Sequence, residues 1–223
     1  MEVMRLSDTN QGVLVARAVA VLRAGGVVLY PTDTLYGLGG DALSDAAVAK
    51  IYAIKGREEK KPIHAIASDM EMVSRYAELN DAGKALAEKF WPGALTLIFE
   101  KSAQGRSASG GKRHTVDTGI ARDINTIGFR IPDNEFCIAL TREFGAPITA
   151  TSANISDMVP QQSVEKILAQ LGLPAQAGDA ASYIDLIIDA GELPERAPST
   201  VVDVSGRVPV ILREGAIPAI SIL

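Results

Sequence analysis

The sequence predicts an α/β protein built on a mixed, twisted β-sheet with flanking helices. Two observations support this fold class. Helical and extended apolar patterns alternate over most of the 223 residues, as they do when helices connect the strands of one sheet. Three extended patterns then follow one another near the C-terminus, which favours a mixed sheet over a purely parallel one.

The first elements follow from apolar spacing and helix caps. Val13 to Leu22 has the spacing of an amphipathic helix, which Gly25 and Gly26 end. Val27 to Tyr30 is an apolar strand, and a polar loop follows it. A helix is then expected from Ala46 to Ile54, with Ser44 as its N-cap.

The middle of the chain continues the alternation. A short strand is expected at His64 to Ala67, and the capping box at Ser68 to Glu71 predicts the start of another helix. Asn80 is expected to cap a helix that runs to Phe90, and Leu95 to Phe99 is the next strand. Residues 101–125 are basic and rich in Gly and Ser, so we expect a long loop there.

The remaining elements are two helices and five strands. A strand at Ile127 to Ile131 precedes a helix over 134–144 that Asp133 is expected to cap. A strand at Pro147 to Ala150 leads into Thr151, and Ser163 is expected to cap a helix over 164–171. The three late strands are Tyr183 to Ile188, Thr200 to Val204 and Val208 to Leu212.

Length and composition fit a single domain over residues 1–223. The chain is 47% hydrophobic and 22% charged, as globular proteins are. No apolar run approaches the roughly 20 residues of a membrane-spanning helix, and the N-terminus has no signal-peptide core. We therefore expect a cytoplasmic protein without a membrane partner.

Charge and rare residues restrict the kind of site. A net charge of −5 argues against strong, indiscriminate nucleic-acid binding. Residues 101–130 nevertheless hold six Lys or Arg and two Asp, so a bound anion would meet local positive charge. Cys137 falls in an apolar helical pattern and is expected to lie in the core. Neither His64 nor His114 has metal-ligand spacing, so we expect no metal site.

An anion site is predicted where the first apolar strand ends. The loop that begins at Thr32 carries hydroxyls, a carboxylate and closely spaced glycines, and the next helix ends in Lys55 and Arg57. Arg binds phosphate through two hydrogen bonds, and Lys supplies a mobile charge. The alternative is an ordinary solvated helix C-terminus, where cations are also favoured.

Further polar residues adjoin predicted strands. Ser152 and Asn154 follow the strand at 147–150, where open α/β sheets often bind ligands, although an Asx-type turn is the alternative. Arg130 lies within an apolar strand and needs a partner, either a carboxylate ligand or a structural Asp. Taken alone, Arg213 would be interpreted as a surface charge, and Ser199 as part of a turn that leads into a strand.

Two familiar nucleotide motifs do not fit. The segment from Gly105 to Arg113 is similar to a phosphate loop but lacks its Ser or Thr and its first Gly. Gly37 to Ala42 satisfies the dinucleotide pattern, yet six residues separate Gly37 from the end of its strand, whereas that fingerprint turns directly out of the strand.

Taken together, these residues resemble the YrdC/TsaC family, the threonylcarbamoyl-AMP synthases of tRNA modification. The resemblance extends from about Gly12 to Gly215 and rests on collinear motifs. They are Pro31-Thr32-Asp33-Thr34-Leu35-Tyr36-Gly37-Leu38, Lys55-Gly56-Arg57 with Ser152-Ala153-Asn154, Phe90-Trp91-Pro92-Gly93-Ala94-Leu95-Thr96, Gly128-Phe129-Arg130-Ile131-Pro132, Pro198-Ser199-Thr200-Val201-Val202-Asp203 and Leu212-Arg213-Glu214-Gly215.

The resemblance implies a YrdC-like twisted sheet around a large, positively lined concave cavity. It implies a nucleotidyltransferase that makes L-threonylcarbamoyladenylate and pyrophosphate from L-threonine, bicarbonate and ATP. Mg²⁺ would be held mainly through phosphates. Downstream proteins that transfer the threonylcarbamoyl group to tRNA would be partners, with weak RNA binding as an addition. Two-domain relatives carry a C-terminal domain that this chain is expected to lack.

The resemblance also implies residue roles. Lys55 and Arg57 would be catalytic and would face the ATP phosphates. The full set expected to bind ATP is Lys55, Arg57, Lys61, Thr126, Ser152, Asn154 and Arg213. The set expected to bind L-threonine is Thr34, Arg130, Ala150 and Ser199, with Arg130 on the carboxylate.

The chain departs from the family pattern at three places. Family members often have His where Ile66 stands, and here His64 comes two residues earlier. The turn over 156–160 and the loop over 101–125 also differ from the usual pattern. Two alternatives stay open: a carbamoyl-adenylate-forming enzyme of this fold, usually part of a larger chain with zinc-finger cysteines, and a non-catalytic RNA-binding module.

Overall fold

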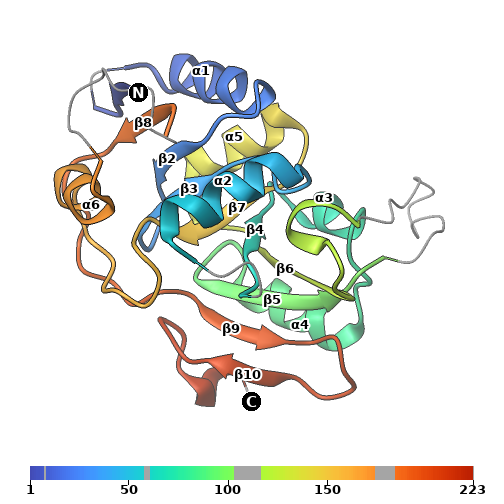
Figure 1. Cartoon of the computed structure of the whole chain (residues 1–223). Coiled ribbons are helices and arrows are strands. Elements are labelled where there is room, and N and C mark those ends of the chain that lie inside the picture. The colour runs from blue at the N-terminus through green and yellow to red at the C-terminus, as the bar shows by residue number, and fades with distance from the viewer. Residues whose placement is uncertain (8, 58–60, 103–116, 174–183, 223) are drawn as a thin grey trace.

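The computed structural model describes residues 1–7, 9–57, 61–102, 117–173 and 184–222. These residues form a ten-stranded sheet in the order β1-β8-β2-β3-β7-β4-β6-β5-β9-β10 (Figure 1). The strands are β1 (Glu2–Arg5), β2 (Val28–Pro31), β3 (Tyr36–Gly39), β4 (His64–Ile66), β5 (Leu95–Glu100), β6 (Thr126–Arg130), β7 (Ile148–Ser152), β8 (Leu186–Asp189), β9 (Thr200–Asp203) and β10 (Val210–Arg213).

The sheet is mixed, as predicted. The pairs β1–β8, β2–β8, β4–β6 and β5–β9 are parallel, and the other neighbouring pairs are antiparallel. The helices are α1 (Gln11–Arg23), α2 (Asp45–Lys55), α3 (Met70–Ser74), α4 (Asp81–Phe90), α5 (Glu135–Phe144) and α6 (Val164–Leu171), with short 3₁₀ turns η1 (Gly119–Ala121) and η2 (Ala219–Ser221).

Two apolar clusters form the core, one on each side of the sheet. Helices α1 and α5 pack together on one face, and α2, α3, α4 and α6 contribute to the cluster on the other. Strand β2 is buried on both sides because its residues alternate between the clusters: Val28 and Tyr30 join the first, and Leu29 joins the second. The predicted core position of Cys137 is confirmed, since its side chain is fully buried.

Several local predictions were wrong. The polar loop after β2 contains β3, and β1 was not expected. Asn134, rather than Asp133, caps α5 by accepting a hydrogen bond from the Cys137 amide at 3.0 Å. Asp69, rather than Ser68, caps α3. Residues 103–116 of the predicted loop 101–125 lie outside the described residues, and its end holds η1.

Other predicted caps are confirmed. Ser44, Asn80 and Ser163 each accept an amide hydrogen bond at the start of α2, α4 and α6, respectively. The dinucleotide pattern at Gly37 is excluded as a phosphate-binding turn because Gly37 and Gly39 lie inside β3. In the described part of the chain, every helix is too short or too polar to cross a bilayer.

Candidate active site

A cavity of about 140 Å³ lies against the central strands of the sheet. Its walls come from segments far apart in the sequence, including the β2–β3 loop, β4, β6, β7 and β10. Of the residues predicted from the sequence to form the site, seven line it: Thr34, Arg57, Arg130, Ala150, Ser152, Ser199 and Arg213. The volume of this cavity is small, and the large cavity implied by the family resemblance stays a prediction.

Arg130 is held on three sides within this cavity. Its Nε donates to the Gly93 carbonyl at 2.8 Å, its Nη1 donates to the Thr34 hydroxyl at 2.8 Å, and its Nη2 forms a 2.7 Å ion pair with Asp33. The side chain is fixed because it is buried, with 7% of the residue exposed. A guanidinium carries five N–H groups, so these contacts leave one on each Nη atom for a carboxylate ligand.

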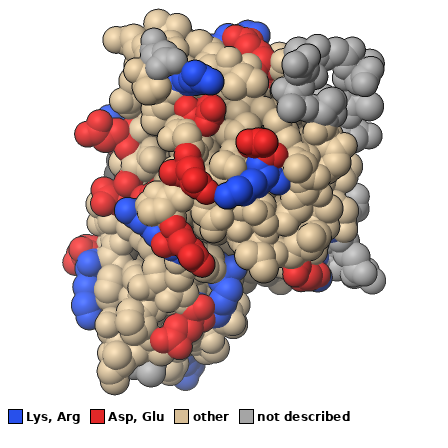
Figure 2. Space-filling model, turned by 90° about the vertical axis from the view of Figure 1, so that its left-hand side faces the viewer, with Lys and Arg blue, Asp and Glu red and all other residues tan. Residues whose placement is uncertain are grey.

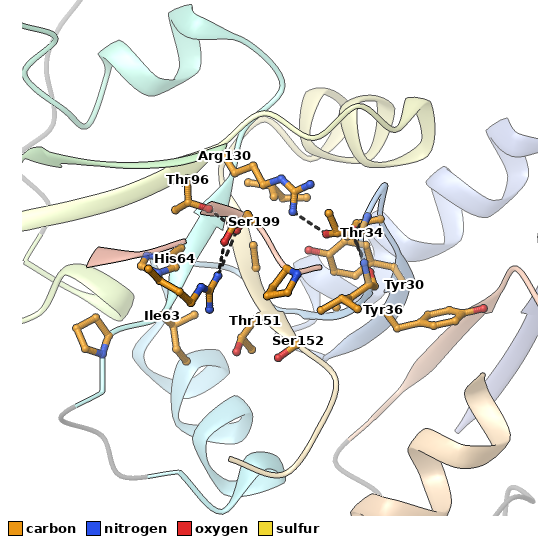
Figure 3. Close-up of a pocket in the computed structure, with 18 of the residues that line it drawn as sticks. Tyr30, Thr34, Tyr36, Ile63, His64, Thr96, Arg130, Thr151, Ser152 and Ser199 are labelled. Atoms are coloured by element: carbon orange, nitrogen blue, oxygen red, sulfur yellow. Dashed lines mark hydrogen bonds between the residues drawn. The ribbon is translucent and has the colours of Figure 1, made fainter. Parts of the chain in front are cut away.

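A second group of contacts joins Arg213, Ser199 and Thr96. Arg213 Nη2 donates to the Ser199 carbonyl at 2.8 Å, and the hydroxyls of Ser199 and Thr96 are 2.9 Å apart (Figure 3). Burial, together with the nearby Arg130 and Arg57, lowers the pKa of Arg213. The like charges that face this cavity therefore favour an anion within it.

Arg57 follows α2, where Gly56 ends the helix in a left-handed conformation. Its Nη2 donates to the Pro62 carbonyl at 2.8 Å. Its Nε is buried and has no hydrogen-bond partner among the described residues. Because no carboxylate in that part of the chain pairs with Arg57 or Arg213, both keep donors for a bound anion.

Lys55 lies beneath the cavity rather than in its wall. Only 1% of the residue is exposed. Its Nζ donates to the Ser152 carbonyl, to the Asn154 carbonyl at 2.8 Å and to Asn154 Oδ1 at 3.2 Å. All three ammonium hydrogens thus have acceptors on the Ser152–Asn154 turn. Burial, with a contribution from Arg57, lowers the pKa of Lys55 to about 8.

Three other residues expected at the ATP site lie outside the lining of this cavity. Asn154 is turned into the protein, where its Nδ2 donates to the carbonyls of Ile155 and Met158. Lys61 pairs with Asp157 at 2.7 Å on the surface. Thr126 begins β6 opposite Glu100. Their contacts with ATP stay predictions.

Sequence reasoning missed several residues that face the cavity, among them Tyr36, His64 and Thr96. Strand alternation could have indicated His64, because it is two residues from Ile66 and both point to one face of β4. Thr96 could not be assigned from spacing alone, since its contact with Ser199 depends on how β5 and β9 pair.

One face of the outer surface contrasts with the cavity. On the face in Figure 2, acidic and basic side chains lie next to one another rather than in a field of one sign. The three arginines described above are instead gathered in the cavity. Within the lining of the cavity, positive charge is therefore concentrated where a small anion would be enclosed.

Known proteins match both the sequence and this fold. A family model for Sua5, YciO and YrdC proteins, described as "Telomere recombination", matches residues 20–215. The chain belongs to this family. The resemblance drawn from sequence motifs is thus confirmed, and the predicted YrdC-like α/β fold agrees with solved structures of the family.

Individual relatives carry more specific names. A mouse protein named threonylcarbamoyl-AMP synthase is 37% identical over 84% of this chain and 61% of its own length. A Methanocaldococcus jannaschii protein named putative threonylcarbamoyl-AMP synthase is 34% identical over 87% of this chain and 82% of its own. A structure of P. abyssi Sua5 complexed with L-threonine matches 99% of this chain with a TM-score of 0.79 and 32% identity. This chain spans 59% of that structure.

Proposed function

We propose that this protein is an L-threonylcarbamoyladenylate synthase, which converts L-threonine, bicarbonate and ATP into L-threonylcarbamoyladenylate and pyrophosphate. The observation that carries the proposal is that the three arginines of the cavity fall into two groups with different partners. Arg130 is fixed beside the Thr34 hydroxyl with two free N–H groups, and Arg57 and Arg213 have no acidic partner among the described residues. An amino acid carboxylate and a polyphosphate are the two anions this arrangement suits.

The names of the relatives support this assignment. The mouse relative is called threonylcarbamoyl-AMP synthase, and the P. abyssi relative was solved with L-threonine. We assign threonine to Thr34, Arg130, Ala150 and Ser199, with its carboxylate on Arg130. We assign the nucleotide to Arg57, Ser152 and Arg213, with Lys61, Thr126 and Asn154 as further contacts and Lys55 beneath Ser152.

The reaction needs no protein nucleophile. The threonine amine and bicarbonate form a carbamate and release water. A carbamate oxygen then attacks the α-phosphorus of ATP, and pyrophosphate leaves. The protein contributes by positioning the reactants and by neutralising charge on the phosphates. Among the described residues, no three His, Cys, Asp or Glu side chains form a metal-binding group. We propose that Mg²⁺ enters with the triphosphate, held mainly by phosphate oxygens and water.

The product is a reactive mixed anhydride, so we propose that it passes to proteins that transfer the threonylcarbamoyl group to tRNA. Synthesis of this adenylate would be the first step of tRNA threonylcarbamoyladenosine modification.

The deciding experiment measures pyrophosphate release by the purified chain. We expect release to require ATP, bicarbonate and L-threonine together. Pyrophosphate release with carbamoyl phosphate, supplied in place of bicarbonate and threonine, would support the carbamoyl-adenylate alternative. RNA binding that weakens with salt, without any pyrophosphate release, would support the non-catalytic alternative instead. Either outcome would overturn the proposal.

A further inference from the structure

His64 is a cavity residue to which the mechanism above assigns no task. It begins β4, where it pairs with Ala150 of β7, and it faces the cavity together with Ile66. No hydrogen bond to either ring nitrogen is present among the described residues, whereas the nearby Thr96, Ser199 and Arg130 side chains all have partners. An imidazole in this position is available to a ligand.

Gly128 has no side chain, and the His64 ring lies in the space that this leaves. Strand β6 runs parallel to β4, and a Cβ atom at Gly128 would lie only 2.3 Å from His64 Nδ1. The ring therefore lies directly on the backbone of β6, in space that any other residue at position 128 would occupy. This contact fixes where the imidazole is, although neither ring nitrogen has a hydrogen bond to a residue that the structure describes.

The charges near His64 are positive. Burial and the cations Arg213 and Arg57 lower the pKa of His64 to about 4, so the free protein holds a neutral imidazole at pH 7. Strands β6 and β7 place the uncharged Gly128 and Ala150 beside it. The remaining cation of the cavity, Arg130, is paired with Asp33. Besides burial, which is the largest cause, the groups that disfavour a proton on His64 are thus the two arginines assigned above to the polyphosphate.

We propose that His64 is a third ligand of the polyphosphate, and that it takes up a proton from water when the anion binds beside Arg57 and Arg213. A phosphate oxygen between the arginines cancels their repulsion and accepts a hydrogen bond from the protonated ring. The proton returns to water when pyrophosphate leaves. This inference rests on the proposed function, because it takes the anion to be the polyphosphate of ATP.

The test follows the His64 imidazole by NMR in ¹⁵N-histidine-labelled protein, with inorganic pyrophosphate as the probe. The chain has only two histidines, so a His114→Gln variant identifies the His64 signal. We expect saturating pyrophosphate to raise the protonation midpoint by about one pH unit or more. L-Threonine alone should leave the midpoint unchanged. A midpoint that does not move with pyrophosphate bound would overturn the inference and leave the proposed synthase activity standing.

Calorimetry provides an independent readout. Pyrophosphate binding near pH 5, between the free and the raised midpoint of His64, should show proton uptake by the wild-type protein and by His114→Gln when it is measured in two buffers of different ionisation enthalpy. A His64→Leu variant should bind pyrophosphate about tenfold more weakly and without that uptake. Equal affinity and equal uptake in His64→Leu would overturn the inference. If pyrophosphate does not bind to the wild-type protein, the inference and the assigned polyphosphate site both fail.

Discussion

At the scale of single residues, Lys55 shows how burial changes a charge. Its ammonium donates to oxygens of Ser152 and Asn154, all of them uncharged, while burial lowers its pKa from 10.5 to about 8. A lowered pKa means that the unfolded chain keeps the proton at pH values where the folded protein has lost it. The free energy of unfolding therefore rises with pH between about 8 and 10.5 through this residue.

This linkage predicts how a Lys55→Met variant compares with the wild type. From pH 8 to pH 10, the wild-type free energy of unfolding should increase relative to that of Lys55→Met, by at most about 1.4 kcal/mol per pH unit. Urea unfolding of both proteins at several pH values measures the difference. A difference that is flat across this range would show that the ammonium titrates as it does in water.

Arg57 should behave differently from Lys55. It is partly exposed, so Arg57→Ala should change the free energy of unfolding by less than about 1 kcal/mol. Pyrophosphate release should nevertheless fall by about a hundredfold or more, because a donor that we assign to the phosphates is lost. Arg57→Lys keeps the charge but not the paired donors and should recover only part of the rate. Wild-type turnover in Arg57→Ala would contradict the phosphate assignment.

At the scale of secondary structure, the start of α5 tests which neighbour caps the helix. Asn134 Oδ1 accepts a hydrogen bond from the Cys137 amide at 3.0 Å, and Asp133 does not cap the helix. We expect Asn134→Ala to lower the free energy of unfolding by about 1 kcal/mol. Asp133→Ala is the matched control and should lower the free energy of unfolding by about 0.3 kcal/mol at most. Equal losses in urea unfolding would contradict the cap.

Strand β9 fixes the segment that follows Arg213. The fully buried Thr200 hydroxyl accepts hydrogen bonds from the amides of Gly215 and Ile217 at 2.9 and 3.0 Å, and donates to the Ile217 carbonyl at 2.7 Å. This one side chain therefore sets the chain path just beyond Arg213, which faces the cavity.

Thr200→Val should accordingly lower both stability and nucleotide use. Two amides and a carbonyl lose their partner, which costs about 1–3 kcal/mol in the free energy of unfolding. The KM for ATP should rise because Arg213 is no longer held in place. Thr200→Ser keeps the hydroxyl and should stay close to wild type in both measurements. A Thr200→Val protein with unchanged KM would show that Arg213 is positioned independently of Thr200.

The elements that the sequence predicted well share a local cause. Helices α2, α4 and α6 follow cap residues whose side chains act within three residues, so spacing alone reveals them. Strand β3 was missed because two of its four residues are glycines, which are typical of turns. It is stabilised instead by pairing with β2 and β7 on either side, which is a long-range property.

At the scale of the whole molecule, the cavity exists because the sheet brings distant segments together. Thr34, Arg130 and Ser199 come from the β2–β3 loop, β6 and the residue before β9. Sequence motifs indicated these residues, but not which of them reach the cavity. Lys55 and Asn154 turn into the protein because each meets acceptors or donors on a neighbouring turn, which only the folded arrangement supplies.

The joint position of these three residues predicts the amino acid preference of the proposed activity. Thr34 and Ser199 are buried hydroxyls in the same cavity as Arg130. Each has hydrogen-bonding capacity beyond its contact with Arg130 or Thr96, so a substrate that lacks a hydroxyl leaves this capacity unmatched, at a cost of about 1–3 kcal/mol. A missing methyl group costs about 0.8 kcal/mol, or roughly a fourfold loss. Threonine should therefore be preferred modestly over serine and more strongly over valine.

Pyrophosphate release at limiting concentrations of each amino acid measures this order as kcat/KM, with and without bicarbonate. An Arg130→Lys variant should lose activity with all three amino acids by a similar factor, because the α-carboxylate that we assign to Arg130 is common to them. The preference for threonine over valine should survive that change, since it depends on the hydroxyl groups and not on Arg130. Turnover of valine equal to that of threonine would remove the hydroxyl contacts from the proposed site, because a cavity recognising only the carboxylate cannot distinguish these substrates.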